Sequence, residues 1–286
     1  MCRILGYLGP AISIDHLVLE PAHSMLVQSY KPKELNNAVL NGDGFGLGWQ
    51  AISPPPSSKK TASAPEEAFV YRNILPMWND RSLPDLCRYI RAENFVVNLR
   101  SATDKMPVDL SNCQPFKWVN GRHSLLFVHN GFIENFFDTL QRPIRQKLCD
   151  RAYRSLQGLT DSEHIFALFI HHLETQPNID LAEALRQTIR LLADMANAAH
   201  VRIAANIILS VKHTDHQSTN HRLISLRYDN QQTAPSLYWL KEPASFPNSI
   251  LVSSEPLFQA DWQSHPQSKL ISIDNALNMK TCGSIA

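Results

Sequence analysis

The chain has 286 residues, of which 44% are hydrophobic and 19% charged, and its formal net charge is +1 at pH 7. This composition is typical of a globular protein of one or two domains, and it lacks the charged field that binding to nucleic acid requires. No apolar run approaches the ~20 residues needed to span a bilayer, and no signal peptide precedes the first strand, so we expect a cytoplasmic protein without a membrane partner. The five cysteines contain no CxxC pair, which indicates neither a zinc site nor a disulfide framework.

The first predicted strand, CRILGYLG, begins at Cys2, directly after the initiator methionine. Removal of Met1 would place a thiol and a free α-amine on one residue, and the amine could act as the base for that thiol. With ordinary pKa values of about 8.5 and about 7.7–8.0, the proton transfer costs only about 1 kcal/mol. A buried, incidental cysteine is the alternative at this position.

Four more short β-like runs follow in the first half: FGLGWQ, AFVYRN, NFVVNLR and SLLFVHN. The segment 52–67 interrupts them with a Pro-, Ser- and Lys-rich sequence that predicts a mobile loop. Two helices are expected next, one starting near Asp161 and one over 180–199 with Asp180 as its N-cap. The runs VRIAANIILSV, HRLISLRY, SLYWLK and SILVSS then return to strands. This order predicts layers of antiparallel sheet covered by helices.

Three motifs on these elements carry polar residues. NGDGFGLGW surrounds Asp43 with glycines, which suits either a pocket wall or a glycine-rich turn that leads into a strand. In NLRSAT, strand alternation places Asn98 and Arg100 opposite Val97 and Leu99, and Arg100 is then either a ligand-binding or a solvated side chain. In FVHNGFIEN, a strand delivers Asn130 and Gly131, and the Asn-Gly pair alone indicates an ordinary turn.

Together these motifs resemble the class II glutamine amidotransferases, which belong to the N-terminal nucleophile hydrolases. The resemblance is closest to the stand-alone branch that includes the ergothioneine-pathway γ-glutamyl hydrolase. It is carried, in order between Met1 and Leu168, by MCRILGYLGP, DGFGLGW, RSAT, NCQPF, HNGFIENF and TDSEHIFAL. It implies an α+β fold, a four-layer αββα sandwich of two antiparallel sheets flanked by helices, formed by residues 2–286 as a single domain.

The resemblance also implies roles for individual residues. Cys2 would be the nucleophile, and Asn130 and Gly131 would donate hydrogen bonds to the oxyanion. Arg100 would bind the α-carboxylate of a γ-glutamyl group, Asp161 its α-ammonium, and Thr103 would also contact the substrate. For Asp161 the alternative is a plain helix N-cap.

Other polar residues are expected to be structural. His129 should point away from Asn130 as a buried or supporting histidine, and Cys113 should be a small buried side chain. His164, His171 and His172 lack the spacing of a metal-binding helix, so we expect no metal, and we expect no cofactor.

The leading hypothesis is therefore a hydrolase of a small-molecule γ-glutamyl substrate, with γ-glutamyl-hercynylcysteine sulfoxide as the substrate that the resemblance implies. A glutaminase or γ-glutamyl peptidase subunit that needs a partner chain is one alternative. A catalytically silent glutamyl-binding protein is another. The sequence leaves a homo-oligomer open.

Overall fold

The computed structural model describes residues 2–34, 40–52, 68–102, 107–214 and 218–285. Its antiparallel strands form two sheets, with the orders β11-β9-β10-β1-β4-β2-β3 and β13-β12-β8-β7-β6-β5. The first sheet contains β1 (Arg3–Ser13), β2 (Phe45–Trp49), β3 (Phe69–Asn73), β4 (Arg91–Leu99), β9 (Tyr238–Lys241), β10 (Ile250–Ser253) and β11 (Gln263–Ser264). The second contains β5 (Phe116–Asn120), β6 (His123–Ile133), β7 (Ile203–Thr214), β8 (Thr219–Asp229), β12 (Lys269–Asp274) and β13 (Met279–Ser284).

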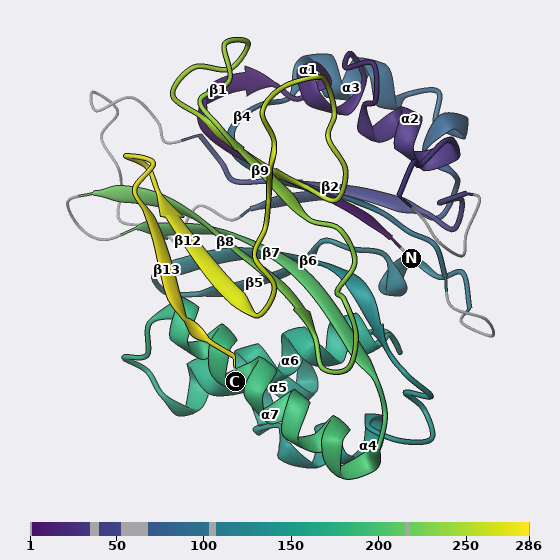
Figure 1. The fold of residues 1–286 in the computed structure, drawn as a ribbon, viewed down its shortest axis with the longest axis vertical. Coiled ribbons are helices and arrows are strands. Elements are labelled where there is room, and N and C mark those ends of the chain that lie inside the picture. Colours follow the sequence, from purple (N-terminus) through teal and green to yellow (C-terminus); the bar gives the residue numbers. More distant parts are fainter. Residues whose placement is uncertain (1, 35–39, 53–67, 103–106, 215–217, 286) are drawn as a thin grey trace.

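Helices cover the outer face of each sheet (Figure 1). On the first sheet lie α1 (Asp15–Val18), α2 (Met25–Tyr30) and α3 (Leu83–Tyr89). On the second lie α4 (Gln141–Lys147), α5 (Asp150–Arg154), α6 (Asp161–Thr175) and α7 (Leu181–Ala199). The short 3-10 turns η1 (Met77–Asn79) and η2 (Leu110–Asn112) lie in loops. The predicted four-layer αββα sandwich is confirmed.

Strand alternation explains why the sandwich has three apolar layers. In β1, Leu5 and Tyr7 pack under α1–α3, whereas Ile4 and Leu8 enter the layer between the sheets. In β6, Phe127 packs under α6 and α7, whereas Val128 faces the other sheet. A strand buried on both faces needs apolar residues at nearly every position, and the polar exceptions therefore stand out.

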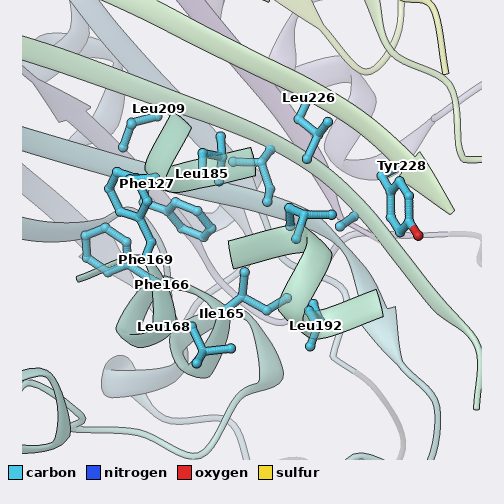
Figure 2. Packing of buried hydrophobic residues seen from close by; sticks show 14 of the residues in the cluster. Phe127, Ile165, Phe166, Leu168, Phe169, Leu185, Leu192, Leu209, Leu226 and Tyr228 are labelled. Atoms are coloured by element: carbon cyan, nitrogen blue, oxygen red, sulfur yellow. The ribbon is translucent and has the colours of Figure 1, made fainter. Parts of the chain in front are cut away.

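The layer between the second sheet and its helices is the largest apolar cluster, and part of it is drawn in Figure 2. Phe166 of α6 stacks on Phe127 with ring centroids 4.9 Å apart. Leu185 and Leu192 extend the cluster along α7, which begins after the predicted N-cap Asp180. The cluster fixes α6 against β6, and the N-terminal end of α6 is one wall of the site described below.

The sequence predicted strands β1 to β4 and β6 to β10 together with helices α6 and α7. Helices α1 to α5 were not expected, nor were β5, β11, β12 and β13. Of the predicted loop 52–67, residues 53–67 lie outside the described residues. In the part of the chain that is described, no helix combines the length and the apolar character needed to cross a membrane.

Candidate active site

Cys2 and Arg100 are brought together by the pairing of β1 with β4. Arg3 lies opposite Leu99, so one step further along both strands places Cys2 beside Arg100. Because Ile4 faces the other sheet, alternation directs the Cys2 side chain to the same side. The Cys2 Sγ atom is half-buried and lies 3.8 Å from the carbonyl oxygen of Ser101.

Arg100 is a buried side chain, so the alternative of a solvated arginine is wrong. Only 4% of it is exposed. Its Nη1 donates to the carbonyl of Asp43 at 3.0 Å and its Nη2 to the carbonyl of Pro107 at 3.3 Å. Both partners are neutral, so neither cancels the charge of the guanidinium, which has five N–H donors in all.

The glycine-rich motif forms the loop that holds Arg100. The carboxylate of Asp43 accepts a hydrogen bond from the amide of Ala102 at 2.7 Å. Gly44 has a φ of +111°, and a Cβ there would lie 2.7 Å from the carbonyl of Asn73. The motif is thus both a turn leading into β2 and a wall of the site.

Asn130 and Gly131 lie on the facing sheet, within β6, and the turn that their sequence indicated does not form. The strand continues to Ile133 because Asn130 pairs with Asn206 of β7 and Gly131 with Ala205. A Cβ at Gly131 would lie 1.9 Å from the carbonyl oxygen of Ala204, so only glycine fits at this close approach. Pairing with β7 therefore overrides the local turn preference.

Gly131 lies on an open edge of this sheet. The pairing of β5 with β6 ends at Phe127. Beyond it the side chain of Gln114 replaces a strand, accepting from the amide of His129 at 2.5 Å and donating to its carbonyl at 3.1 Å. Backbone N–H groups two residues apart on a strand point to the same side, so the N–H of Gly131 points out of the sheet edge on the side that Gln114 occupies at His129. No described strand pairs with Gly131 on that side.

The side chain of Asn130 is fully buried, yet neither Nδ2 nor Oδ1 has a hydrogen-bond partner among the described residues. Such an amide costs about 1–3 kcal/mol for each unpaired group, and it is rare unless a ligand or water supplies the partner. Asn130 Nδ2 and the Gly131 amide thus provide two donors at one strand end. That arrangement suits a developing oxyanion.

Asp161 lies beside this edge at the start of α6. Its Oδ2 accepts from the amide of Ile133 at 2.8 Å and its Oδ1 from the amide of Ser162 at 2.7 Å. The N-cap of α6 is Thr160, whose hydroxyl accepts from the amide of Glu163, so the capping alternative for Asp161 is wrong. The carboxylate is held in place by backbone amides and retains lone pairs for a cation.

His129 points toward the helices and acts as a support, as predicted. Burial lowers the pKa of this histidine, which keeps it neutral. Its Nε2 then donates to the carbonyl of Ala204 at 3.2 Å, and its Nδ1 accepts from the hydroxyl of Ser162 at 2.8 Å. His129 therefore links β6 and β7 to the start of α6.

The remaining candidates have structural contacts. Burial raises the pKa of the Cys113 thiol, and its Sγ lies near the carbonyls of Asn73 and Asp109. The Nδ1 of His164 donates to the carbonyl of Thr160, and its Nε2 accepts from Arg145. Both ring nitrogens are thereby engaged. Thr103 lies outside the described residues.

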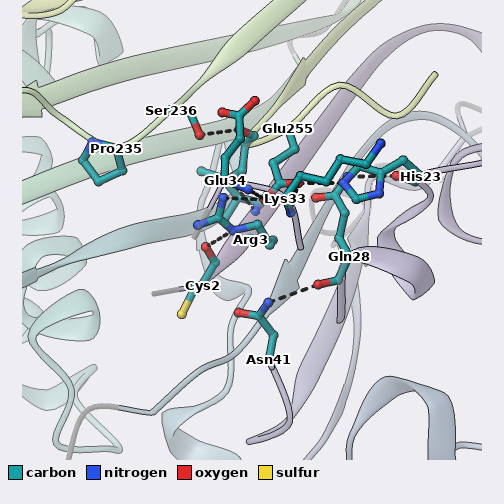
Figure 3. A network of polar contacts seen from close by, with 12 residues as sticks. Cys2, Arg3, His23, Gln28, Lys33, Glu34, Asn41, Pro235, Ser236 and Glu255 are labelled. Atoms are coloured by element: carbon teal, nitrogen blue, oxygen red, sulfur yellow. Dashed lines mark hydrogen bonds and ion pairs between the residues drawn. The ribbon is translucent and has the colours of Figure 1, made fainter. Parts of the chain in front are cut away.

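A buried ion pair behind Cys2 was not predicted (Figure 3). Arg3 Nε donates to the carbonyl of Cys2 at 2.8 Å, and Arg3 Nη1 lies 3.0 Å from Glu255 Oε1. Glu255 also binds His23 Nε2 at 2.6 Å and accepts from the amides of Lys33 and Glu34. The only sequence signal was a charged residue inside an apolar strand, directly after Cys2.

Comparison with protein families gives a match between residues 79–235 and the class II glutamine amidotransferases. A probable glutamine amidotransferase of Saccharomyces cerevisiae, DUG3, is 27% identical over 306 residues, covering 96% of this chain and 82% of that protein. The γ-glutamyl-hercynylcysteine sulfoxide hydrolase of Mycobacterium tuberculosis is 31% identical over 152 residues, which cover 53% of this chain and 58% of that protein.

Solved structures support the fold alone. A glutamine aminotransferase class-II domain protein from Silicibacter pomeroyi superposes with a TM-score of 0.62 at 22% identity, over 98% of both chains. The allosteric regulatory enzyme of purine biosynthesis gives a TM-score of 0.62 at 13% identity, over 99% of this chain and 49% of the other.

Proposed function

Because the chain belongs to the class II glutamine amidotransferases, we propose that it is an amidohydrolase that cleaves a γ-glutamyl amide bond through Cys2 at a processed N-terminus. The observation that carries the proposal is the pair of unused donors at the end of β6, on the sheet that faces Cys2. A thiol on one sheet and oxyanion donors on the other are the parts that acyl transfer needs.

In the proposed first step, the α-amine of Cys2 accepts the thiol proton, and Sγ attacks the γ-carbonyl carbon. The carbonyl oxygen becomes an oxyanion, bound by Asn130 Nδ2 and the amide of Gly131. Loss of one such donor typically costs about 100- to 1000-fold in rate. The ammonium then protonates the leaving nitrogen, the C–N bond breaks, and a glutamyl thioester remains on Cys2.

In the second step, the amine accepts a proton from water, and the hydroxide attacks the thioester carbon. The C–S bond breaks, the ammonium returns its proton to Sγ, and glutamate leaves, which restores the thiol and the free amine. Arg100 binds the α-carboxylate through its planar fork, and Asp161 binds the α-ammonium. Thr103 is proposed as a further contact to the glutamyl group. Fixing both ends of the amino acid aligns its γ-carbon with Sγ.

For the substrate we propose γ-glutamyl-hercynylcysteine sulfoxide, as an intermediate of ergothioneine biosynthesis. Its support is the 31% identity to a hydrolase named for that compound. A second candidate is a glutaminase or γ-glutamyl peptidase subunit that works with a partner chain. The similarity to the probable glutamine amidotransferase, which extends over 96% of this chain, supports the glutaminase part of that candidate.

The test is to incubate the purified protein alone with glutamine, a γ-glutamyl dipeptide and γ-glutamyl-hercynylcysteine sulfoxide, and to measure released glutamate. The proposal expects the sulfoxide to have the highest kcat/KM. Activity that requires an added partner chain would favour the second candidate instead.

The nucleophile is tested separately with Cys2→Ala and with a glutamine-mimicking electrophile. We expect Cys2→Ala to abolish glutamate release and covalent labelling, whereas the control Cys282→Ala, at a half-buried thiol on β13, retains both. Intact mass should show that Met1 is absent from active protein. Labelling at Cys113, or activity with Met1 retained, would contradict the mechanism.

A further inference from the structure

Asn98 of β4 is a second asparagine with the same unusual environment as Asn130. It is fully buried, and neither Nδ2 nor Oδ1 has a partner among the described residues. By contrast, Asn94 on the same face of β4 donates from Nδ2 to the carbonyls of Val211 and Arg222. An asparagine that crosslinks the sheets, like Asn94, has a structural explanation. Asn98 has none.

A short chain of contacts links Asn98 to Asn130 across the space between the sheets. Asn98 pairs with Gly46 of β2, and the position of a Cβ on Gly46 would lie 2.0 Å from the carbonyl oxygen of Gln114. The side chain of Gln114 in turn binds the backbone of His129, the neighbour of Asn130. Strands β4 and β6 accordingly approach with Cα atoms within 8 Å of one another.

Both asparagines face this space. Side chains two residues apart on a strand point to the same face, so Asn98 points the same way as Val96, and Asn130 the same way as Val128. Both valines lie in the layer between the sheets. Both amides thus lie in the layer between the sheets, and Asn98 pairs with Ile4 near the Cys2 end of β1.

An amide that stabilises an oxyanion must be held in one of its two orientations. If Asn130 Nδ2 is to face the substrate, Asn130 Oδ1 must face away, and it then needs a donor. Asn98 Nδ2 is a buried donor without a partner on the facing strand. A hydrogen bond from Asn98 Nδ2 to Asn130 Oδ1, direct or through one water, would satisfy both groups.

We infer that Asn98 is a positioning residue that orients the amide of Asn130 for the oxyanion. The inference rests on the proposed function, in which Asn130 is a donor to the oxyanion. Asn98 itself does not touch the reacting atoms. Its effect should therefore appear in kcat, where the oxyanion forms, and not in KM, which reports binding of the glutamyl group by Arg100 and Asp161.

The test compares Asn98→Leu, which keeps the size but removes the donor, with the matched control Asn94→Leu. We expect Asn98→Leu to lower kcat by about 10- to 100-fold with KM changed by less than about 3-fold. Its melting temperature should fall less than that of Asn94→Leu, because Asn94 Nδ2 donates to two carbonyls of the facing sheet, whereas the inferred contact of Asn98 is a single hydrogen bond. Asn94→Leu should melt at a lower temperature and retain kcat. A fall in the melting temperature of Asn98→Leu, with kcat retained, would overturn the inference.

A double-mutant cycle with Asn130→Ala separates this inference from the proposed function. In the Asn130→Ala background, we expect Asn98→Leu to change kcat by less than about 3-fold, because the amide that it orients is gone. Multiplicative losses would overturn the positioning role and leave Asn130 as the oxyanion donor. If Asn130→Ala alone retains kcat, the oxyanion assignment in the proposed function is wrong. Should Asn98→Leu fail to fold, Asn98→Ala serves in the same cycle.

Discussion

Glu255 should be the most sensitive polar residue behind the site. Its side chain and that of Arg3 are each only 1% exposed. It accepts hydrogen bonds from Arg3, from His23 and from the amides of Lys33 and Glu34. Glu255→Ala leaves the Arg3 charge buried without its partner, and breaking such a pair costs about 3–5 kcal/mol. We expect a loss of about 4 kcal/mol in the free energy of unfolding.

The assay is urea unfolding of the wild type, Glu255→Gln and Glu255→Ala, followed by the midpoint and the slope of the transition. Glu255→Gln keeps an acceptor oxygen and should lose about half as much. Because Arg3 also holds the carbonyl of Cys2, Glu255→Ala should lower kcat at temperatures where it is still folded. A loss below about 1 kcal/mol in Glu255→Ala would refute the reasoning.

The same carboxylate predicts how this stabilisation depends on pH. Burial alone would raise the pKa of Glu255, but His23, the two backbone amides and Arg3 hold it below its ordinary value. The stabilisation is therefore complete above the pKa of an unfolded glutamate, about 4.3, and is lost as the pH falls through the lower folded pKa. The stability difference between wild type and Glu255→Gln should shrink below about pH 4.

Three further predictions concern the fold around the site. Gly46→Ala would place its Cβ 2.0 Å from the carbonyl oxygen of Gln114, so it should cost about 1–3 kcal/mol of stability and much of kcat, measured by thermal melts and activity assays. The control Gly42→Ala, whose Cβ would lie 3.4 Å from Trp78 and 3.9 Å from Pro76, should change neither. Burial lowers the pKa of His164 and of His265 to about 4 each, so the unfolded chain binds protons between about pH 6.5 and 4 that the folded chain does not. As the pH falls through this range, the free energy of unfolding should decrease by about 1.4 kcal/mol per pH unit for each histidine. If the pH dependence of stability in His265→Gln equals that of the wild type, this reasoning is wrong. Asp180→Ala removes the cap of α7 and the contact with Arg222, and should cost about 1 kcal/mol in urea unfolding, whereas Asp180→Asn keeps the cap and should cost less than half of that.

The sequence was informative where function depends on residues within one strand or one helix. Alternation in NLRSAT correctly placed Asn98 and Arg100 on one face, and the apolar repeat after Asp180 correctly placed α7. It failed at Asn130 and Gly131, because the Asn-Gly pair favours a turn and only the pairing with β7 keeps the strand extended. Tertiary pairing overrides local preference in such cases.

Contacts between distant residues could not be derived from local patterns. Arg3 and Glu255 are 252 positions apart, and Gln114 and His129 are 15 apart in separate elements. Strand β13, MKTCGS, is mostly exposed and lacks the apolar alternation by which a local pattern could mark it. A buried polar residue inside an apolar strand was the available signal for Arg3, and it identifies the residue without its partner.

The side chain of Gln114 has a consequence for how this protein can tolerate insertions. It occupies the place of a strand residue at His129, so β5 stops short of Gly131. If β5 began a few residues earlier, it would continue to pair with β6, and the amide of Gly131 would donate its hydrogen bond to β5. The protein would keep its fold, its thiol and its arginine, yet lose one donor. The length of β5, an edge strand that contains no site residue, thus determines whether the amide of Gly131 is free to bind an oxyanion.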